Sequence, residues 1–256
     1  AYDQALATGS PERDYAAYQK AISYGFLGQE QTKRDALDTF IGRFPNSSLK
    51  DDALFELGNS YVQSAADNQA IASYDRLIRE SPGSSLVPAA KMRKGLVYYN
   101  GGQNQQALTV FKEVADQYPN SQEAMQAVAT AKLIYVDMGQ VDQYAAWVRG
   151  LDFVEVTDSE LEAASFEAAE KQLVEGNDAA AARALEKYLE QFPNGANRVA
   201  AHFNLGQIAY ADGQADKALA HFEVVADAGR GERAEQALTR VCEILVSRGD
   251  YAAAMP

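Results

Sequence analysis

Residues 51–82 read DDALFELGNSYVQSAADNQAIASYDRLIRESP, and this stretch decides the fold. Its first part carries Leu57 and Gly58, and its second part carries Ala70 and Tyr74. Gly58 and Ala70 are small, so two antiparallel helices can approach closely there, with large side chains on either side of the seam. Pro82 ends the second helix because its ring and missing N–H cannot continue one. The stretch therefore predicts a helix-turn-helix pair.

The same pattern recurs along the chain with a step of 37 residues. The terminal proline falls at Pro45, Pro82, Pro119 and Pro193, with Val156 where one is missing. The turn between the helices carries a glycine on the same step, at Gly28, Gly102, Gly139, Gly176 and Gly213, with Ala65 in the remaining place. One such pair cannot bury its apolar face alone and needs neighbours on each side. We therefore predict an all-α solenoid of antiparallel helix pairs.

The repeat predicts six two-helix units, with partial repeats at both ends. The units cover residues 9–45, 46–82, 83–119, 120–153, 157–193 and 194–230. Residues 1–8 are expected to end a second helix, and residues 235–256 to form a first helix followed by the start of a second. Because natural solenoids finish with polar caps, we expect the chain to be a piece of a longer repeat protein.

The fourth unit departs from the pattern. Lys132 and Tyr144 stand at its small positions, its proline is lost, and it continues into the β-branched run 151–156. Thr157 with Glu160, or Ser159 with Glu162, would make a capping box that starts the next helix. We predict a first block over 1–150, an irregular joint over 151–158 and a second block over 159–256. The joint would be either a hinge or a sharper bend.

Charge and composition exclude several classes of function. The net charge of −13 argues against nucleic acid, which needs clustered lysine and arginine. Cys242 is the single cysteine, and its place in the repeat is a close-packing position, where a small buried thiol is expected. His202 and His221 lack companions at ligand spacing, so we expect no metal site. No cofactor motif is present, and no stretch has the apolar length of a membrane span.

Paired carboxylates are the remaining catalytic candidate, because they can perform general acid–base chemistry. The acidic residues that cluster on one predicted helix are Glu160, Glu162, Glu167 and Glu170. They come from a single exposed face rather than from two walls of a cleft, so we expect them to be solvated. We predict that the chain is not an enzyme and has no catalytic residues.

The connections between units carry a family resemblance. They read Phe44-Pro45-Asn46-Ser47, Tyr118-Pro119-Asn120-Ser121 and Phe192-Pro193-Asn194-Gly195. Proline followed by Asn, Ser or Gly is typical of turns and helix N-caps. With Leu57-Gly58, these connections resemble the bacterial envelope branch of tetratricopeptide repeat proteins, which includes the barrel-assembly lipoprotein and the periplasmic partner of the Tol-Pal system. The resemblance implies a right-handed superhelix and a periplasmic or outer-membrane-associated location, with a lipid anchor upstream as one arrangement.

The resemblance also implies that the first helix of each pair lines a concave groove, which binds a protein or peptide partner. Steps of three and four residues from Leu57-Gly58 select the groove positions on one helix face. The groove residues predicted in this way are Tyr18, Phe55, Asn59, Met92, Leu96, Tyr99, Asn100, Phe166, Phe203, Gln207 and Tyr210. Phe55, Phe166 and Phe203 have an alternative interpretation, in which they pack between neighbouring units.

The predicted groove is aromatic and aliphatic with scattered Asn and Gln, which favours an apolar or extended peptide. The lysines with which some relatives hold carboxylate tails are missing from it. We therefore predict a non-catalytic protein-binding scaffold. Three alternatives stay open: a structural array that oligomerises through its other faces, a cell-wall glycan binder that stacks aromatic rings on sugars, and a cytoplasmic regulator of the same family.

Overall fold

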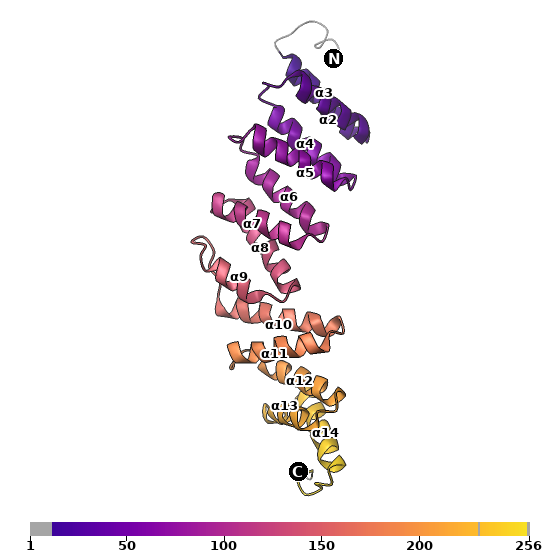
Figure 1. Cartoon of the computed structure of the whole chain (residues 1–256), viewed down its shortest axis with the longest axis vertical. Coiled ribbons are helices and arrows are strands. Elements are labelled where there is room, and N and C mark those ends of the chain that lie inside the picture. The colour runs from indigo at the N-terminus through magenta and orange to yellow at the C-terminus, as the bar shows by residue number, and fades with distance from the viewer. Residues whose placement is uncertain (1–11, 230, 255–256) are drawn as a thin grey trace. The chain divides into compact units, whose positions relative to one another are not determined.

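A computed structural model describes residues 12–229 and 231–254 of the chain. These residues form thirteen α-helices and no β-strand (Figure 1). The helices are α2 (Arg13–Phe26), α3 (Glu30–Arg43), α4 (Lys50–Gln63), α5 (Asp67–Glu80), α6 (Val87–Asn100), α7 (Asn104–Gln117), α8 (Gln122–Asp137), α9 (Val141–Val148), α10 (Asp158–Val174), α11 (Asp178–Gln191), α12 (Arg198–Ala211), α13 (Ala215–Asp227) and α14 (Glu232–Ser247).

Each of the six predicted units contains one pair of helices, from α2 with α3 to α12 with α13. The fold is therefore the predicted all-α solenoid. Residues 1–8 lie outside the described residues. Tyr251 to Ala254 form turns rather than the start of a second helix. Their single described backbone bond of helical spacing runs from Ala254 N to Asp250 O, at 3.3 Å.

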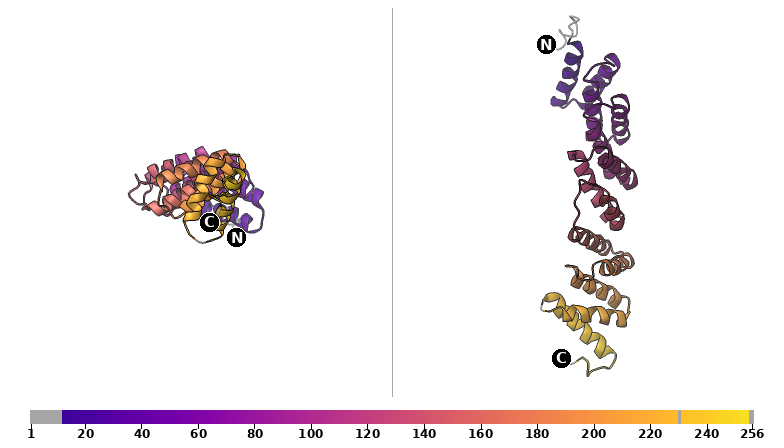
Figure 2. Two further views of the ribbon diagram at one scale, coloured as in Figure 1. Left: turned by 90° about the horizontal axis from the view of Figure 1, so that it is seen from below. Right: turned by 90° about the vertical axis from the view of Figure 1, so that its left-hand side faces the viewer.

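The chain divides into two compact blocks, an N-terminal block of residues 1–134 and a C-terminal block of residues 135–256. The division falls inside α8, so residues 151–158 lie within the C-terminal block. In the N-terminal block, the pairs α2–α3, α4–α5 and α6–α7 follow one another in chain order (Figure 1), as the colours of Figure 2 also show. In the C-terminal block the pairs α10–α11 and α12–α13 pack in the same manner.

The turn positions explain the glycine ladder. Gly28, Gly102, Gly139, Gly176 and Gly213 have φ between 65° and 76°, in the left-handed region that favours glycine. Ala65 occupies the same turn between α4 and α5 with φ 55°. The ladder therefore marks a backbone requirement, which alanine meets once at a conformational cost.

The seam between the paired helices explains the small residues. Gly58 of α4 faces Tyr74 of α5, and a Cβ atom added to Gly58 would lie 2.5 Å from Cε1 of that ring. Gly95 meets Phe111 in the same way at 2.5 Å, and Gly206 meets Phe222 at 2.7 Å. These rings are fully buried, so the aromatic side chain of the second helix fills the space that each glycine leaves.

The fourth pair replaces this seam with an aromatic cluster. Helix α9 has 8 residues, where the other second helices have 13 or 14. Tyr144 stands where other pairs carry alanine, and its ring centroid lies 6.1 Å from Tyr135 and 6.4 Å from Trp147. The chain then runs without helix to Thr157, which caps α10. Thr157 and Glu160 form the predicted capping box, with Glu160 N donating to Thr157 Oγ1 at 3.2 Å.

Serines in the connections between pairs form turns and, in one case, an N-cap. Ser47 Oγ donates to Asp14 Oδ2 at 2.6 Å and accepts from Leu49 N at 3.2 Å, so it closes a turn just before α4. Ser84 does the same with Asp51 and Leu86 N, at 2.5 and 3.1 Å. Each serine therefore ties the loop to the start of the first helix in the preceding pair. Ser121 caps the next helix, because its Oγ accepts from Ala124 N at 3.0 Å in the first turn of α8. The connections thus provide both the turns and an N-cap, as their sequence predicts.

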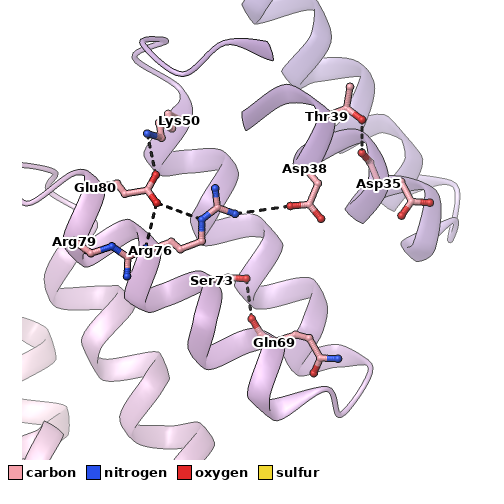
Figure 3. Close-up of polar contacts among 9 residues, drawn as sticks. All are labelled: Asp35, Asp38, Thr39, Lys50, Gln69, Ser73, Arg76, Arg79 and Glu80. Carbon is pink, nitrogen blue, oxygen red and sulfur yellow. Dashed lines mark hydrogen bonds and ion pairs between the residues drawn. The ribbon is translucent and has the colours of Figure 1, made fainter. Parts of the chain in front are cut away.

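Charged side chains also join neighbouring pairs in the N-terminal block. Glu80 of α5 accepts from Lys50 of α4 at 3.0 Å and from Arg76 at 3.4 Å (Figure 3). The hydrogen bond from Lys50 is the largest influence that lowers the pKa of Glu80. Arg76 also reaches Asp38 of α3 at 4.0 Å. These contacts connect α3, α4 and α5 along one side of the stack.

Candidate partner-binding surface

The aromatic residues of the predicted groove rest on the rings of the second helices. Tyr18 and Phe40 have ring centroids 5.8 Å apart, and Phe55 and Tyr74 are 6.0 Å apart. The C-terminal block repeats the arrangement with Phe166 on Tyr188 at 5.5 Å and Phe203 on Phe222 at 6.2 Å. Phe166 is buried, whereas Tyr18, Phe55 and Phe203 are half-buried. Each half-buried ring thus packs on one side and meets solvent on the other.

A hollow of about 550 Å³ opens on the first helices of the N-terminal block. Its apolar floor consists of Phe55 from α4, Ala89, Met92 and Leu96 from α6, and Ala129 from α8. We call it the α6–α8 hollow. The structure therefore brings three predicted groove residues, Phe55, Met92 and Leu96, to one concave site.

The wall of the α6–α8 hollow is polar. Gln122, Glu123, Gln126 and Thr130 line it from α8, and Arg93 lines it from α6. Arg93 is exposed. Burial raises the pKa of Tyr74 to about 12, and the charge of Arg93 opposes this shift, whereas that of Glu56 adds to it. The hollow combines an apolar floor with amide and hydroxyl groups at its edge, as ligand-binding sites commonly do.

A second hollow of about 570 Å³ lies between the first helices of the C-terminal block. Val199 and Phe203 of α12 line it on one side, and Glu232, Arg233 and Gln236 of α14 line it on the other. We call it the α12–α14 hollow. Phe203 is the predicted groove residue that reaches it.

Two predicted groove residues are already engaged within the chain. Tyr74 Oη donates to Asn59 Oδ1 at 2.9 Å, so the carbonyl of this amide is occupied. Tyr210 Oη donates to Glu243 of α14 at 3.2 Å, and the guanidinium of Arg240 lies 4.7 Å from the Tyr210 ring centroid. Both residues therefore stabilise helix packing, and Tyr210 keeps 37% of its surface exposed.

The remaining predicted residues differ in their exposure. Tyr99 and Gln207 are half-buried, and Asn100 is exposed at the C-terminal end of α6. Leu96 is half-buried in the α6–α8 hollow. Unlike Asn59 and Tyr210, the polar side chains of Tyr99, Asn100 and Gln207 form no described hydrogen bond within the chain. Together with Leu96, they stay candidates for contact with a partner.

The electrostatics near Tyr18 are acidic. Burial, followed by the charges of Asp52 and Glu56, raises the pKa of Tyr18 to about 12. Burial also raises the pKa of Asp52, with Asp51 and Glu56 as neighbouring like charges. Glu56 is paired with the buried Lys33 at 2.9 Å. The N-terminal half of α4, which also contains Phe55 of the α6–α8 hollow, thus carries several negative charges.

The histidines form a pair that the sequence did not predict. Nδ1 of His202 in α12 lies 3.0 Å from Nδ1 of His221 in α13, so one imidazole donates to the other. Burial lowers the pKa of His202 to about 4, and the charge of His221 adds to this effect. Burial also lowers the pKa of His221. The repeat pattern predicts that α12 and α13 form one helix pair, and this pairing is the only signal in the sequence that the two histidines could be in contact.

The acidic residues of α10 are only partly solvated, which corrects the sequence-based expectation. Glu162 Oε1 accepts from Tyr188 Oη at 2.7 Å and from Asn197 N at 3.2 Å. Glu160 belongs to the capping box at the start of α10. Glu167 and Glu170 are exposed, as predicted. The described residues contain no group of three or more side chains that could hold a metal ion. None of the described helices is apolar over a length that would cross a bilayer.

Two family models match most of the helix pairs. Both are described as tetratricopeptide repeat, one at residues 15–47, 52–84 and 89–121 and the other at residues 166–233. Together they cover more than half of the chain. The α12–α14 hollow is lined mainly by residues within these matches, whereas the α8 side of the α6–α8 hollow lies outside them. No curated protein sequence matches the chain at a significant level.

Solved structures with similar backbones have low sequence identity to the chain. A tetratricopeptide repeat protein from Parabacteroides merdae is 14% identical with a TM-score of 0.47, over 94% of this chain and 89% of that one. The C-terminal part of a repeat protein from Cytophaga hutchinsonii is 14% identical with a TM-score of 0.47, over 93% and 92%. The pilF protein of Pseudomonas aeruginosa is 15% identical with a TM-score of 0.41, over 87% and 95%.

Proposed function

Because the chain belongs to the tetratricopeptide repeat family, we propose that it is a non-catalytic scaffold that binds a protein partner on its first helices. The observation that carries this proposal is the α6–α8 hollow. Phe55, Met92 and Leu96 were selected as groove residues by the family resemblance and the repeat register, and all three line that hollow. A site made by equivalent positions of successive pairs suits a ligand that crosses several helices.

The chemistry of the hollow favours an extended peptide segment as ligand. Its floor offers apolar surface to one or two side chains, and the amides of Gln122 and Gln126 can hydrogen-bond with a peptide backbone. A compact charged ligand would find little here, because Arg93 and Glu123 bring opposite charges to the hollow. The proposed partner is therefore a segment of protein with exposed apolar side chains.

We further propose that this scaffold acts in a bacterial envelope assembly. The support is the aromatic-Pro-Asn-Ser/Gly connection at Phe44, Tyr118 and Phe192, which resembles the envelope branch of the family. A periplasmic or outer-membrane-associated location and an upstream lipid anchor are part of the same proposal. Fractionation of the source cells would test it, since recovery of the protein from the cytosol would contradict it and favour a cytoplasmic regulator.

Selection of peptides from a displayed library on the immobilised chain tests the binding function. Selected peptides should bind the wild-type chain and lose affinity for Leu96→Lys, because this change puts a charge on the apolar floor of the hollow. Thr109→Lys is the matched control, since Thr109 is exposed on the second helix α7 and receives the same charge. Equal loss in both variants, or no selected peptide at all, would contradict the proposal.

A second candidate function is self-association, and one observation favours it. Phe26 and Leu27, at the turn between α2 and α3, expose 88% and 69% of their surface. Adjacent exposed apolar side chains of this size are typical of contact sites. Light scattering on the wild-type chain and on the double variant Phe26→Gln, Leu27→Gln would decide. A wild-type oligomer that dissociates in the variant supports a structural array, and a wild-type monomer excludes it at the concentrations tested.

A further inference from the structure

The α6–α8 hollow exists where the repeat lacks a large side chain. The position that Ala129 occupies carries Tyr18, Phe55, Phe166 or Phe203 in four of the other pairs. Those rings pack on the second helix of their own pair. Ala129 is exposed and has only a methyl group, so the space that a ring fills elsewhere is open here. Ala89, which also belongs to the floor of the hollow, is small as well.

The open space offers an apolar surface to a large side chain of a partner. Phe55, Met92 and Leu96 present ring, thioether and isobutyl groups to it, and Met92 is adaptable because its chain is unbranched. A large apolar side chain from a partner would lose its contact with water there, and burial of apolar surface is the main favourable term in association.

A carboxylate without a cation lies one helical turn from the hollow. Asp52 precedes Phe55 by three residues on α4, so both lie on the same helix face. Its two acidic neighbours are engaged, since Glu56 pairs with Lys33 at 2.9 Å and Asp51 accepts from Ser84 Oγ at 2.5 Å. Within residues 12–229 and 231–254, no lysine or arginine lies within ion-pair distance of Asp52.

The environment of Asp52 favours a cation from outside the chain. Burial raises the pKa of Asp52, and the charges of Asp51 and Glu56 raise it further. A lysine or arginine side chain would relieve this repulsion. The charges of Asp52 and Glu56 also act on Tyr18, and the face of an aromatic ring can receive a cation.

We propose that the α6–α8 hollow takes one large apolar side chain of a partner peptide, and that Asp52 binds a lysine or arginine of the same peptide. This inference rests on the proposed function and specifies its ligand, an extended segment with an aromatic or leucine anchor and a basic residue. The hollow supplies the affinity for the anchor, and Asp52 supplies the preference for positive charge over negative charge.

The anchor site is tested with a substitution that fills the α6–α8 hollow with a side chain of the chain itself. Peptides selected from a displayed library on the wild-type chain are measured against Ala129→Phe, which restores the aromatic residue found at Phe55 and Phe203. We expect an affinity loss of at least about tenfold, equivalent to about 1.4 kcal/mol. Ala72→Phe, on the exposed side of α5, makes the same change elsewhere and should leave affinity unchanged. Ala129→Leu is a smaller second variant, and circular dichroism checks the helicity of each.

The test of the charge uses a double-mutant cycle. Asp52→Asn should weaken selected peptides that contain the basic residue by about tenfold and leave their Lys→Ala or Arg→Ala counterparts unchanged. Selected peptides without a basic residue, or equal weakening of both forms, would overturn the assignment to Asp52.

The outcomes also separate this inference from the proposed function. One outcome would contradict the anchor site alone. In that outcome the selected peptides lose affinity for Leu96→Lys but bind Ala129→Phe and Ala129→Leu as tightly as the wild-type chain, with both variants still helical. The proposed scaffold function would then remain supported. Failure to select any peptide would contradict the scaffold, and the ligand proposed here would fall with it.

Discussion

Gly58 and Tyr74 lie so close that an added Cβ atom would come within 2.5 Å of the Tyr74 ring. In most helices the change from glycine to alanine is stabilising, by about 0.5–1 kcal/mol. Here the methyl group would enter a fully packed seam, where overpacking costs about 1–3 kcal/mol. We therefore predict that Gly58→Ala lowers the free energy of unfolding by an amount in this range, as measured by urea denaturation.

The control for this prediction is Gly42→Ala. Gly42 lies in α3, and an added Cβ there would have no atom within 4 Å. This variant should gain about 0.5–1 kcal/mol, because alanine restricts the unfolded chain more than glycine does. If both variants were stabilised, the close packing at Gly58 would not constrain the fold.

At the turn that contains Ala65, a substitution is expected to raise the free energy of unfolding. Ala65 has φ 55°, whereas the equivalent turns carry glycine. The left-handed conformation costs a residue with a Cβ atom about 1–2 kcal/mol, and part of that cost is offset by the extra freedom of glycine in the unfolded state. Ala65→Gly should raise the free energy of unfolding by about 0.5–1 kcal/mol.

The comparison for the turn is an alanine inside a helix. Ala72 is exposed in α5, so Ala72→Gly should lower stability by about 1 kcal/mol. Thermal unfolding, monitored by circular dichroism, checks that Ala65→Gly raises the midpoint and that Ala72→Gly lowers it. A destabilised Ala65→Gly variant would show that the methyl group of Ala65 contributes more than the backbone strain costs.

The features behind these two predictions were visible in the sequence because each depends on one residue type. A left-handed turn selects glycine and a close helix contact selects a small residue, so both appear as ladders with a fixed step. The hollow was only half predictable. The repeat register placed Phe55, Met92 and Leu96 on one helix face. The open space, however, arises because Ala129 stands where other pairs carry an aromatic ring, and the groove prediction did not consider the effect of a missing ring.

Contacts between side chains of different helices escaped prediction. The 3.0 Å approach of His202 to His221 and the bonds from Tyr188 and Asn197 to Glu162 depend on rotamers and on the spacing of two helices. A single sequence contains neither quantity. The acidic face of α10 was therefore expected to be wholly solvated, although one of its carboxylates is held by a buried hydroxyl.

The pair of Lys33 and Glu56 predicts unequal effects from its two partners. The Lys33 side chain is 10% exposed and that of Glu56 is 33% exposed. Glu56→Met would leave a buried ammonium without its carboxylate, which should cost about 1–3 kcal/mol. Lys33→Met removes the buried charge and keeps much of its apolar stem, so its cost should be smaller. Urea denaturation of both variants checks the order, and equal or reversed losses would contradict the unequal burial.

The hydroxyl of Tyr188 stabilises the loop before α12. It donates to Glu162 at 2.7 Å and accepts from Asn197 N at 3.1 Å, and burial followed by Glu162 raises its pKa. Tyr188→Phe should lower the free energy of unfolding by about 1–2 kcal/mol, because it removes two hydrogen bonds from a buried site. Tyr144→Phe is the control, since no hydrogen bond is described for the Tyr144 side chain, and it should change stability by about 0.5 kcal/mol or less. Similar losses in both variants would remove the hydroxyl as the cause.

The histidine pair predicts a loss of stability in weak acid. The pKa of His202 falls from an ordinary 6.5 to about 4, chiefly through burial, and that of His221 is also lowered. Above pH 6.5 both folded and unfolded chains hold neutral imidazoles, so the pair contributes no pH dependence. As the pH falls below 6.5 the unfolded chain binds protons that the folded chain refuses, so the free energy of unfolding declines until about pH 4.

The surrounding charges act on this pair in both directions. Arg198 of α12 and Lys217 of α13 lower the pKa values, and Glu186 of α11 raises that of His221. Carboxylates such as Glu80, with its lowered pKa, contribute mainly below the ordinary glutamate value of 4.5. Between pH 6.5 and pH 4.5 the histidines therefore contribute to the pH dependence, whereas Glu80 contributes little.

Thermal unfolding at a series of pH values in that interval checks the effect. The midpoint of the wild-type chain should fall steadily with pH, whereas the double variant His202→Gln, His221→Gln should show a flatter profile, because glutamine can hydrogen-bond but does not titrate there. The single variant His221→Gln leaves one buried imidazole and should keep part of the slope. A wild-type midpoint that is constant over the interval, or a double variant with the same slope, would show that the imidazoles accept protons in the folded chain as readily as in the unfolded one.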